Sequence, residues 1–111
     1  MYTLSLTEDE LLFILVLYGV VDDEIFERYG LDASQTTKER LKKGEESLRT
    51  RELVTGESNV PYLSDEATAL VGVTVLNTPE NHVYLDEESG LRVRFVREAG
   101  MYLFKGELSE E

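Results

Sequence analysis

The stretch LRVRFVREAGMYLFKGEL, residues 91–108, decides the fold class, because apolar and polar residues alternate on both sides of a glycine turn. Alternation with a period of two is typical of β-strands that bury one face, and the glycine permits a tight reversal. HVYLD, residues 82–86, alternates in the same way and is separated from the stretch by ESG. The sequence therefore predicts a three-stranded antiparallel meander over residues 82–108.

The register of this meander depends on the length of its turns. Three-residue turns with glycine in the left-handed position place five apolar residues on the core face: Val83, Leu85, Val93, Phe95 and Leu103. The same register sets Asp86 opposite Arg92, a favourable pair, whereas a two-residue second turn would set Arg94 opposite Lys105. Charge and apolar pattern therefore both favour three-residue turns.

That register leaves one arginine and four apolar or aromatic residues on the face away from the core. They are Tyr84, Arg94, Val96, Tyr102 and Phe104. An exposed apolar patch with tyrosines and an arginine has the composition of a protein interface. The alternatives are that residues 1–4 of the same chain cover this face, or that the strands pair in another register.

The segments before the meander have helical patterns. Thr7 and Glu10 form a capping box, so a helix should begin at Glu8 and end at Gly19. Its residues 11–18 are apolar all round, which places it at the centre of the core. DDEIFERY, residues 22–29, predicts a short second helix with acids in its first turn.

A third helix should span residues 37–51, opened by a capping box of Thr36 and Glu39. Leu41, Gly44 and Leu48 form its narrow buried stripe. A glycine inside a helix costs about 1 kcal/mol relative to alanine, and its usual reason is a close backbone. We therefore predict that the first helix crosses the third at Gly44.

Two short extended pieces, residues 53–55 and 60–62, follow the third helix and are joined by a glycine turn. A fourth helix should begin after Ser64 and stop at NTP, residues 77–79. The expected fold class is α+β, with a winged-helix-like helical domain followed by a three-stranded antiparallel β-meander. Residues 1–111 are expected to form a single domain, with a winged-helix-like part at 5–76 and antiparallel strands at 82–108.

The order helix, short helix, long helix, two-stranded turn and helix resembles a winged-helix domain over residues 5–76. The resemblance implies that residues 37–51 form the recognition helix and that TGESN, residues 55–59, is the wing. More weakly, LTEDELLFILVLYG, ERLKKGEESLRTRELV and LSDEATALVGVTVLNTPENHVYL, with the strands, are similar to one half of the type VII secretion chaperones that escort PE and PPE proteins. That resemblance implies a chaperone-like role or pairing with a second copy.

The net charge of −12 comes from 23 acids and 11 bases, a field that opposes nucleic acids and anionic membranes. Such acidity is also found as an adaptation to high salt. The chain has no cysteine, and its longest apolar run is too short to cross a bilayer. We therefore expect a cytoplasmic protein without disulfides, membrane contacts, cofactors or metal sites.

Enzymatic chemistry has little support, because the one histidine, His82, has no partner for nucleophilic or acid–base catalysis in sequence. The acidic clusters occupy helix starts and turns, and no phosphate loop or zinc spacing occurs. The chain is therefore expected not to be an enzyme.

The predicted helix at 37–51 is the part of the sequence that suggests nucleic-acid binding. Its candidate phosphate contacts are Lys38, Lys42, Lys43 and Arg49. Glu39 reaches Lys42 and Lys43, and Glu45 and Glu46 reach Arg49, so much of the positive charge is expected to be paired. We therefore favour a non-enzymatic protein-binding or self-associating module, an adaptor or chaperone-like protein that contacts a protein partner or a second copy through the outer face of the meander. The alternative is a winged-helix DNA-binding transcription regulator that uses residues 37–51.

Overall fold

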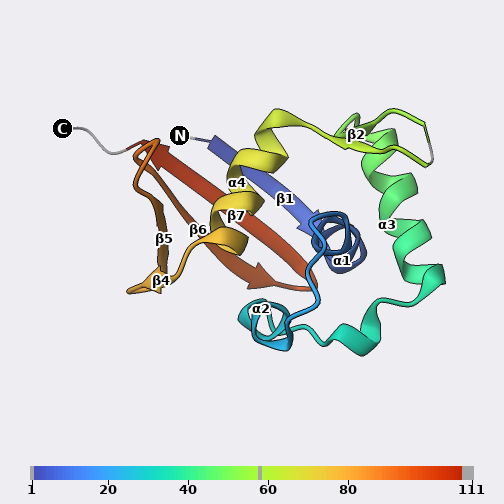
Figure 1. Ribbon diagram of the computed structural model, residues 1–111, viewed down its shortest axis with the longest axis horizontal. Coiled ribbons are helices and arrows are strands. Elements are labelled where there is room, and N and C mark those ends of the chain that lie inside the picture. The colour runs from blue at the N-terminus through green and yellow to red at the C-terminus, as the bar shows by residue number, and fades with distance from the viewer. Residues whose placement is uncertain (1, 58, 109–111) are drawn as a thin grey trace. The chain divides into compact units, whose positions relative to one another are not determined.

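The computed structural model describes residues 2–57 and 59–108 as a mixed α and β structure (Figure 1). The chain divides into two compact units. Residues 6–64 form one, called here the helical unit, and residues 2–5 with 65–108 belong to the other, called the sheet unit. The prediction of an α+β fold is therefore confirmed, whereas the prediction of one domain over residues 1–111 stays a prediction.

The helical unit begins with α1, Glu8–Leu17, which starts where the capping box predicts. The backbone N–H of Glu10 donates to the Thr7 hydroxyl at 3.2 Å, and the Thr7 N–H donates to the Glu10 carboxylate at 2.8 Å. The two bonds satisfy donors that every helix start leaves without an intrahelical partner. The short helix α2 follows at Asp23–Arg28, and Asp22 caps it.

Helix α3, Lys38–Thr50, packs against α1. The two backbones come close at Gly44, where an added Cβ would lie 2.7 Å from the carbonyl carbon of Asp9 and overlap its oxygen. Only glycine fits such an approach, so the predicted crossing of the first and third helices at Gly44 is confirmed.

The start of α3 differs from the prediction. Thr37, not Thr36, is the cap, and its hydroxyl accepts from the Arg40 N–H at 3.3 Å. The Thr36 hydroxyl instead donates to the Ala33 carbonyl, because a single turn of 3-10 helix, η1 at Ala33–Gln35, ends there. The predicted capping box of Thr36 and Glu39 is therefore wrong: the cap lies one residue later, and Arg40 stands at the position that a capping glutamate would occupy.

After α3, the strands β2, Val54–Thr55, and β3, Tyr62–Leu63, pair antiparallel, which confirms the predicted two-stranded turn. The helical unit therefore contains the first four of the five elements on which the winged-helix resemblance rests, but not the final helix. Helix α4, Asp65–Leu76, ends before Asn77, as predicted, but it belongs to the sheet unit and packs there on β5, β6 and β7.

The sheet unit holds a five-stranded antiparallel sheet in the order β1-β7-β6-β5-β4. Its strands are β1 Tyr2–Thr7, β4 Pro79–Glu80, β5 Val83–Asp86, β6 Leu91–Glu98 and β7 Met101–Leu108. The prediction of a three-stranded meander after a helical domain is therefore wrong. YTLSLT at the start of the chain alternates as a strand does, and it adds an edge to the sheet beside β7.

The register of the meander is also shifted by one residue. Glu98 pairs with Met101, so Ala99 and Gly100 alone form the turn between β6 and β7, both with positive φ. Four residues, 87–90, join β5 to β6, and Leu85 rather than Asp86 stands opposite Arg92. A slip of one residue exchanges the faces of a strand, so the predicted faces of β5 and β7 are reversed.

The reversed faces bury aromatic rings. Tyr84, Tyr102 and Phe104 are buried, and each stacks or tilts on the Phe95 ring, at centroid distances of 5.9, 6.3 and 5.4 Å. Burying a large apolar side chain is worth about 1.5–3 kcal/mol, whereas a like-charge pair across strands costs roughly 0.2–1 kcal/mol. The burial of the rings therefore outweighs the unfavourable charges that this register brings together.

Each described helix is too short, or not apolar enough, to cross a membrane.

Candidate functional site on the outer face of the sheet

One face of the sheet carries α4, and the opposite face of β5, β6 and β7 we call the outer face. The alternation of the strands places ten side chains there: Val83, Leu85, Arg92, Arg94, Val96, Glu98, Met101, Leu103, Lys105 and Glu107. None of the ten is fully buried, and Leu85 and Val96 are 38% and 52% exposed. Within the sheet unit this face is therefore open to contact by another molecule.

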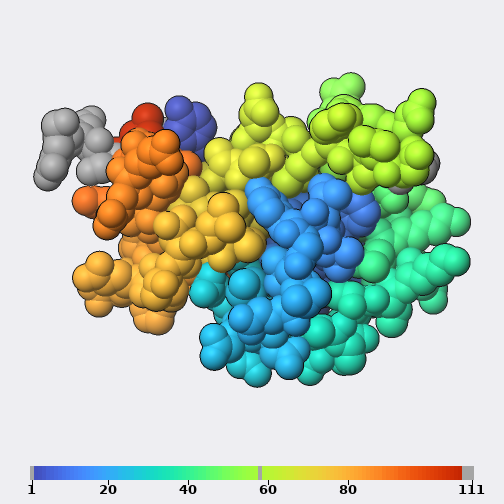
Figure 2. Space-filling view, viewed as in Figure 1, coloured from blue at the N-terminus to red at the C-terminus, as the bar shows by residue number. Residues whose placement is uncertain are grey.

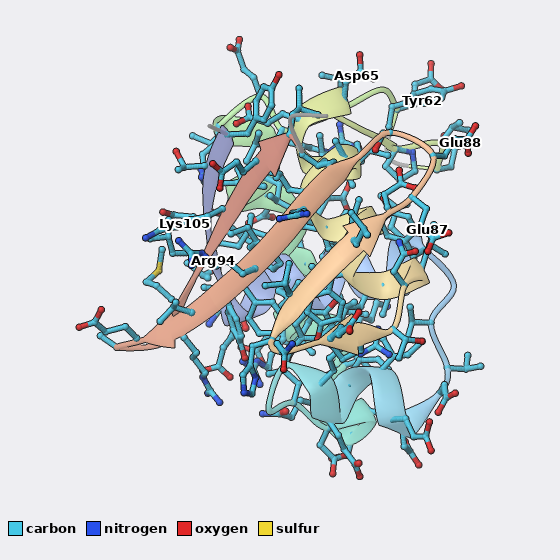
Figure 3. The ribbon with its side chains drawn as sticks, turned by 90° about the vertical axis from the view of Figure 1, so that its left-hand side faces the viewer. Tyr62, Asp65, Glu87, Glu88, Arg94 and Lys105 are labelled. Atoms are coloured by element: carbon cyan, nitrogen blue, oxygen red, sulfur yellow. The ribbon has the colours of Figure 1, made fainter. Side chains whose placement is uncertain are left out.

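Positive charge gathers in the middle of the outer face. Arg94 on β6 stands directly opposite Lys105 on β7, and Figure 3 shows the two labelled residues close together on the sheet. Arg92 precedes Arg94 by two residues and therefore lies on the same face. Three of the four bases in the sheet unit are thus on this face, and the fourth, Arg97, lies over the Tyr102 ring at 5.5 Å.

These bases border a shallow hollow of 220 Å³. Arg92, Arg94 and Lys105 line it together with one acid, Glu107, so its side chains carry a net charge of +2. The apolar Val83 contributes to the wall of the hollow. A concave surface with excess positive charge and an apolar wall suits a carboxylate attached to an apolar group.

The three bases have no carboxylate of the described residues within 4.0 Å. Glu107 is directly opposite Arg92, but it does not form an ion pair at that distance. Like charges placed opposite each other on a sheet are destabilising. The Arg94–Lys105 pair therefore carries an electrostatic cost, and neither side chain has a carboxylate of the described residues within 4.0 Å to offset it.

The predicted partner-binding residues divide between the two faces. Arg94 and Val96 lie on the outer face, whereas Tyr84, Tyr102 and Phe104 lie buried on the other face, so the prediction that these three rings are uncovered is wrong. The predicted register placed Arg92 on the outer face, although not as a partner contact, and it missed Val83, Leu85, Leu103 and Lys105 there. The two-residue turn at Ala99 and Gly100 is the signal that could have found them, because it places Arg94 opposite Lys105.

The candidate phosphate contacts on α3 are partly engaged elsewhere. Lys43 lies 3.9 Å from Glu39, and the Arg49 Nε donates to Glu45 at 2.9 Å, so these two predicted pairs are confirmed. Arg49 also donates to the carbonyl oxygens of Gly56 and Glu57 in the turn between β2 and β3. Its guanidinium therefore fixes the hairpin to α3. Two further candidates, Lys38 and Lys42, are exposed.

Two other bases of α3 and its cap form contacts that local spacing does not reveal. Arg40 donates to Asp9 at 2.7 Å, and Arg51 donates to both oxygens of Glu10 at 2.8 and 2.9 Å. Glu10 is fully buried and also accepts from the Ser47 hydroxyl at 2.8 Å. A buried carboxylate needs such partners, so this cluster holds α1 to α3 and has a structural role.

The described residues include no group of three or more His, Asp or Glu side chains placed to hold a metal ion. His82 is exposed and lies with Asn81 in the turn between β4 and β5, rather than in a strand.

Comparison with known proteins identifies no family. No protein-family model matches the chain, and no curated protein or solved structure is detectably similar to it. The winged-helix and secretion-chaperone resemblances therefore rest on the order of the elements and on the sequence patterns alone.

Proposed function

We propose that this chain is a non-enzymatic protein-binding module that uses the outer face of its sheet to bind a partner segment with acidic and apolar side chains. The observation that carries the proposal is the opposition of Arg94 and Lys105 next to Arg92. A carboxylate of the partner placed among these bases would replace repulsion by attraction. Leu85, Val96 and Leu103 would at the same time bury apolar surface against the partner.

The proposal reverses the expected charge of the partner. The acidity of the whole chain favours a basic or neutral partner, but a segment bound at the hollow contacts its lining, where three bases stand beside one acid. Charges further away than about 8 Å are largely screened at physiological ionic strength. The overall charge should therefore slow the approach of an acidic partner, while close contacts decide its affinity.

The alternative of a DNA-binding regulator that uses residues 37–51 stays a prediction. Of its four candidate residues, Lys43 and Arg49 have ion-pair partners on their own helix. Phosphate binding by Arg49 would also compete with its two bonds to the β2–β3 turn. These contacts favour protein binding over DNA binding as the function to test first.

The test is a selection of random extended peptides, displayed on phage, on the immobilised full-length chain. We expect the enriched peptides to combine Asp or Glu with aliphatic or aromatic residues. Synthetic versions should bind the double variant Arg94→Glu/Lys105→Glu about tenfold more weakly, a change of roughly 1.4 kcal/mol. Circular dichroism would verify that the variant keeps its fold.

The matched control is Lys38→Glu/Lys42→Glu, which makes the same change of charge on exposed positions of α3. The proposal predicts unchanged peptide binding in this control. Peptides without acids, or equal losses in both double variants, would contradict it. Binding of duplex DNA that is lost in the α3 variant and kept in the outer-face variant would favour the regulator instead.

A further inference from the structure

The sheet unit contains a second concave surface, on the side of the sheet that carries α4. This groove has a volume of 660 Å³ and lies where the start of α4 meets the ends of β1 and β7 and the turn between β5 and β6. Figure 2 shows the start of β1, the end of β7 and this turn together at the surface. Every residue that lines the groove belongs to the sheet unit.

The walls of the groove are apolar. Leu70 and Val73 of α4 form one side, and Leu91 and Leu108 of the sheet form the other. The α4 wall is held close to the sheet at Gly106, where an added Cβ would lie 2.5 Å from the Leu70 Cδ2. Tight packing below the groove therefore makes it a formed surface that an apolar group can enter without rearrangement of α4.

Among the described residues, the charged ones in the lining are all acids: Asp65, Glu66 and Asp86. Asp65 and Glu66 occupy the first turn of α4, where the helix dipole stabilises them, which is their ordinary structural role. The Asp86 oxygens accept from the Glu88 N–H at 3.3 Å and the Ser89 hydroxyl at 2.7 Å. A carboxylate has about four acceptor positions, so Asp86 keeps capacity for another donor.

We infer that this groove is a binding site for a small amphiphilic cation, a molecule with a compact apolar body and a protonated amine. Volumes of about 300–1,000 Å³ are typical of sites for small organic ligands. The apolar walls would take the body of the ligand, and the carboxylates of Asp65, Glu66 and Asp86 would attract the ammonium group. The same carboxylates would repel an anion of equal shape. This inference is independent of the outer face, because no residue lines both concave surfaces.

A pair of indole compounds makes the experiment simple, because the chain has no tryptophan. Tryptamine is a cation at neutral pH, and indole-3-acetate has a similar body with a negative charge. Excitation at wavelengths that only indole absorbs reports the ligand alone, through its fluorescence anisotropy. We expect tryptamine to bind and indole-3-acetate to bind at least tenfold more weakly. In methyl NMR spectra, tryptamine should shift the signals of Leu70, Val73 and Leu91.

Variants separate this site from general attraction to an acidic protein. Asp65→Asn/Asp86→Asn should weaken tryptamine binding roughly fivefold or more, since partly exposed charge pairs are worth up to about 1 kcal/mol each. Glu87→Gln/Glu88→Gln removes the same charge from the neighbouring turn, outside the groove, and should leave the affinity unchanged within twofold. Figure 3 shows both control residues beyond β5.

A third variant, Ala69→Phe, places a ring in the lining and should abolish tryptamine binding while the groove keeps its charge. Equal affinity for the two indole compounds would overturn the inference. So would equal losses in the two carboxylate variants, or methyl shifts confined to residues outside the groove. Loss of peptide binding at the outer face would not affect these results, so the two proposals fail separately.

Discussion

Arg94 of β6 stands directly opposite Lys105 of β7, on the face of the sheet that α4 does not cover. In the neighbouring pair on the same face, Arg92 stands opposite Glu107. The outer face thus contains one repulsive and one attractive pair in equivalent positions. Substitutions in the two pairs should therefore change the stability of the sheet in opposite directions.

Arg94→Glu should stabilise the protein, because it converts the repulsive pair with Lys105 into an attractive one. We expect a gain of about 0.5–1 kcal/mol in the free energy of unfolding. Arg92→Glu makes the same charge change opposite Glu107 and should cost a similar amount. Urea denaturation at low ionic strength measures both. Equal effects of the two substitutions would show that the strands pair in a different register.

Gly44→Ala should destabilise the helical unit, although alanine favours helix by about 1 kcal/mol. The added methyl group would overlap the Asp9 carbonyl, and such overpacking costs about 1–3 kcal/mol. The midpoint of thermal unfolding should therefore fall. Glu46→Ala, at an exposed position of the same helix, is the control and should change stability by less than about 0.5 kcal/mol.

Arg51→Met should lower the free energy of unfolding by about 2 kcal/mol, because it removes a charged donor from the buried carboxylate of Glu10. Lys42→Met also removes one positive charge from the α3 region, but Lys42 is exposed, so a small change is expected. Chemical denaturation of both variants at neutral pH makes the comparison. A loss in Lys42→Met as large as in Arg51→Met would mean that net charge, not the Glu10 contact, is responsible.

Phe104→Ala should cost about 3–5 kcal/mol, because the ring is fully buried against Phe95. Tyr102→Asp should unfold the sheet unit, rather than block association in a folded protein as an exposed ring would. Val96→Asp changes an exposed residue two positions from Arg94 and serves as the control. Native near-ultraviolet circular dichroism in Tyr102→Asp would contradict the burial of this ring.

Asp32 should titrate below its ordinary pKa of 3.8, because its carboxylate accepts from the backbone N–H and the hydroxyl of Ser34. A carboxyl group whose pKa is lower in the folded state contributes stability above its unfolded pKa and loses it as the pH falls through the folded value. Asp32→Asn should remove this part of the acid dependence. The chemical shift of the Asp32 carboxyl carbon, followed by NMR, gives its pKa directly. A value at or above 3.8 would be incompatible with the Ser34 hydrogen bonds.

The helical elements could be predicted from the sequence because their signals are local. Thr7 and Glu10 lie three residues apart and mark the start of α1 without reference to any other part of the chain. Gly44 carries longer-range information, since a glycine that interrupts a helical stripe implies a nearby backbone. The contacts of Glu10 with Ser47 and Arg51 could not be predicted, because they join residues 37 and 41 positions apart.

The candidate site was harder to predict, because the length of the turn between β6 and β7 decides which side chains of β7 lie on the outer face. Ala99 adopts a positive φ, which is uncommon for a residue with a side chain, and the sequence EAG does not distinguish two turn residues from three. Charge favoured the wrong register at roughly 0.2–1 kcal/mol, whereas three aromatic rings favoured the right one at several times that value. Because burial of the rings is the larger contribution to stability, it favours the register in which Arg94 and Lys105 are neighbours.

The placement of β1 beside β7 affects the order in which parts of the protein fold during synthesis. During synthesis, β1 must wait for its neighbour, Met101–Leu108, which is made only after residues 8–100. Residues 6–64 are complete much earlier and can form their helices meanwhile. The nascent chain should therefore pass through a stage in which the helical half has folded and the first strand still lacks the hydrogen bonds of β7.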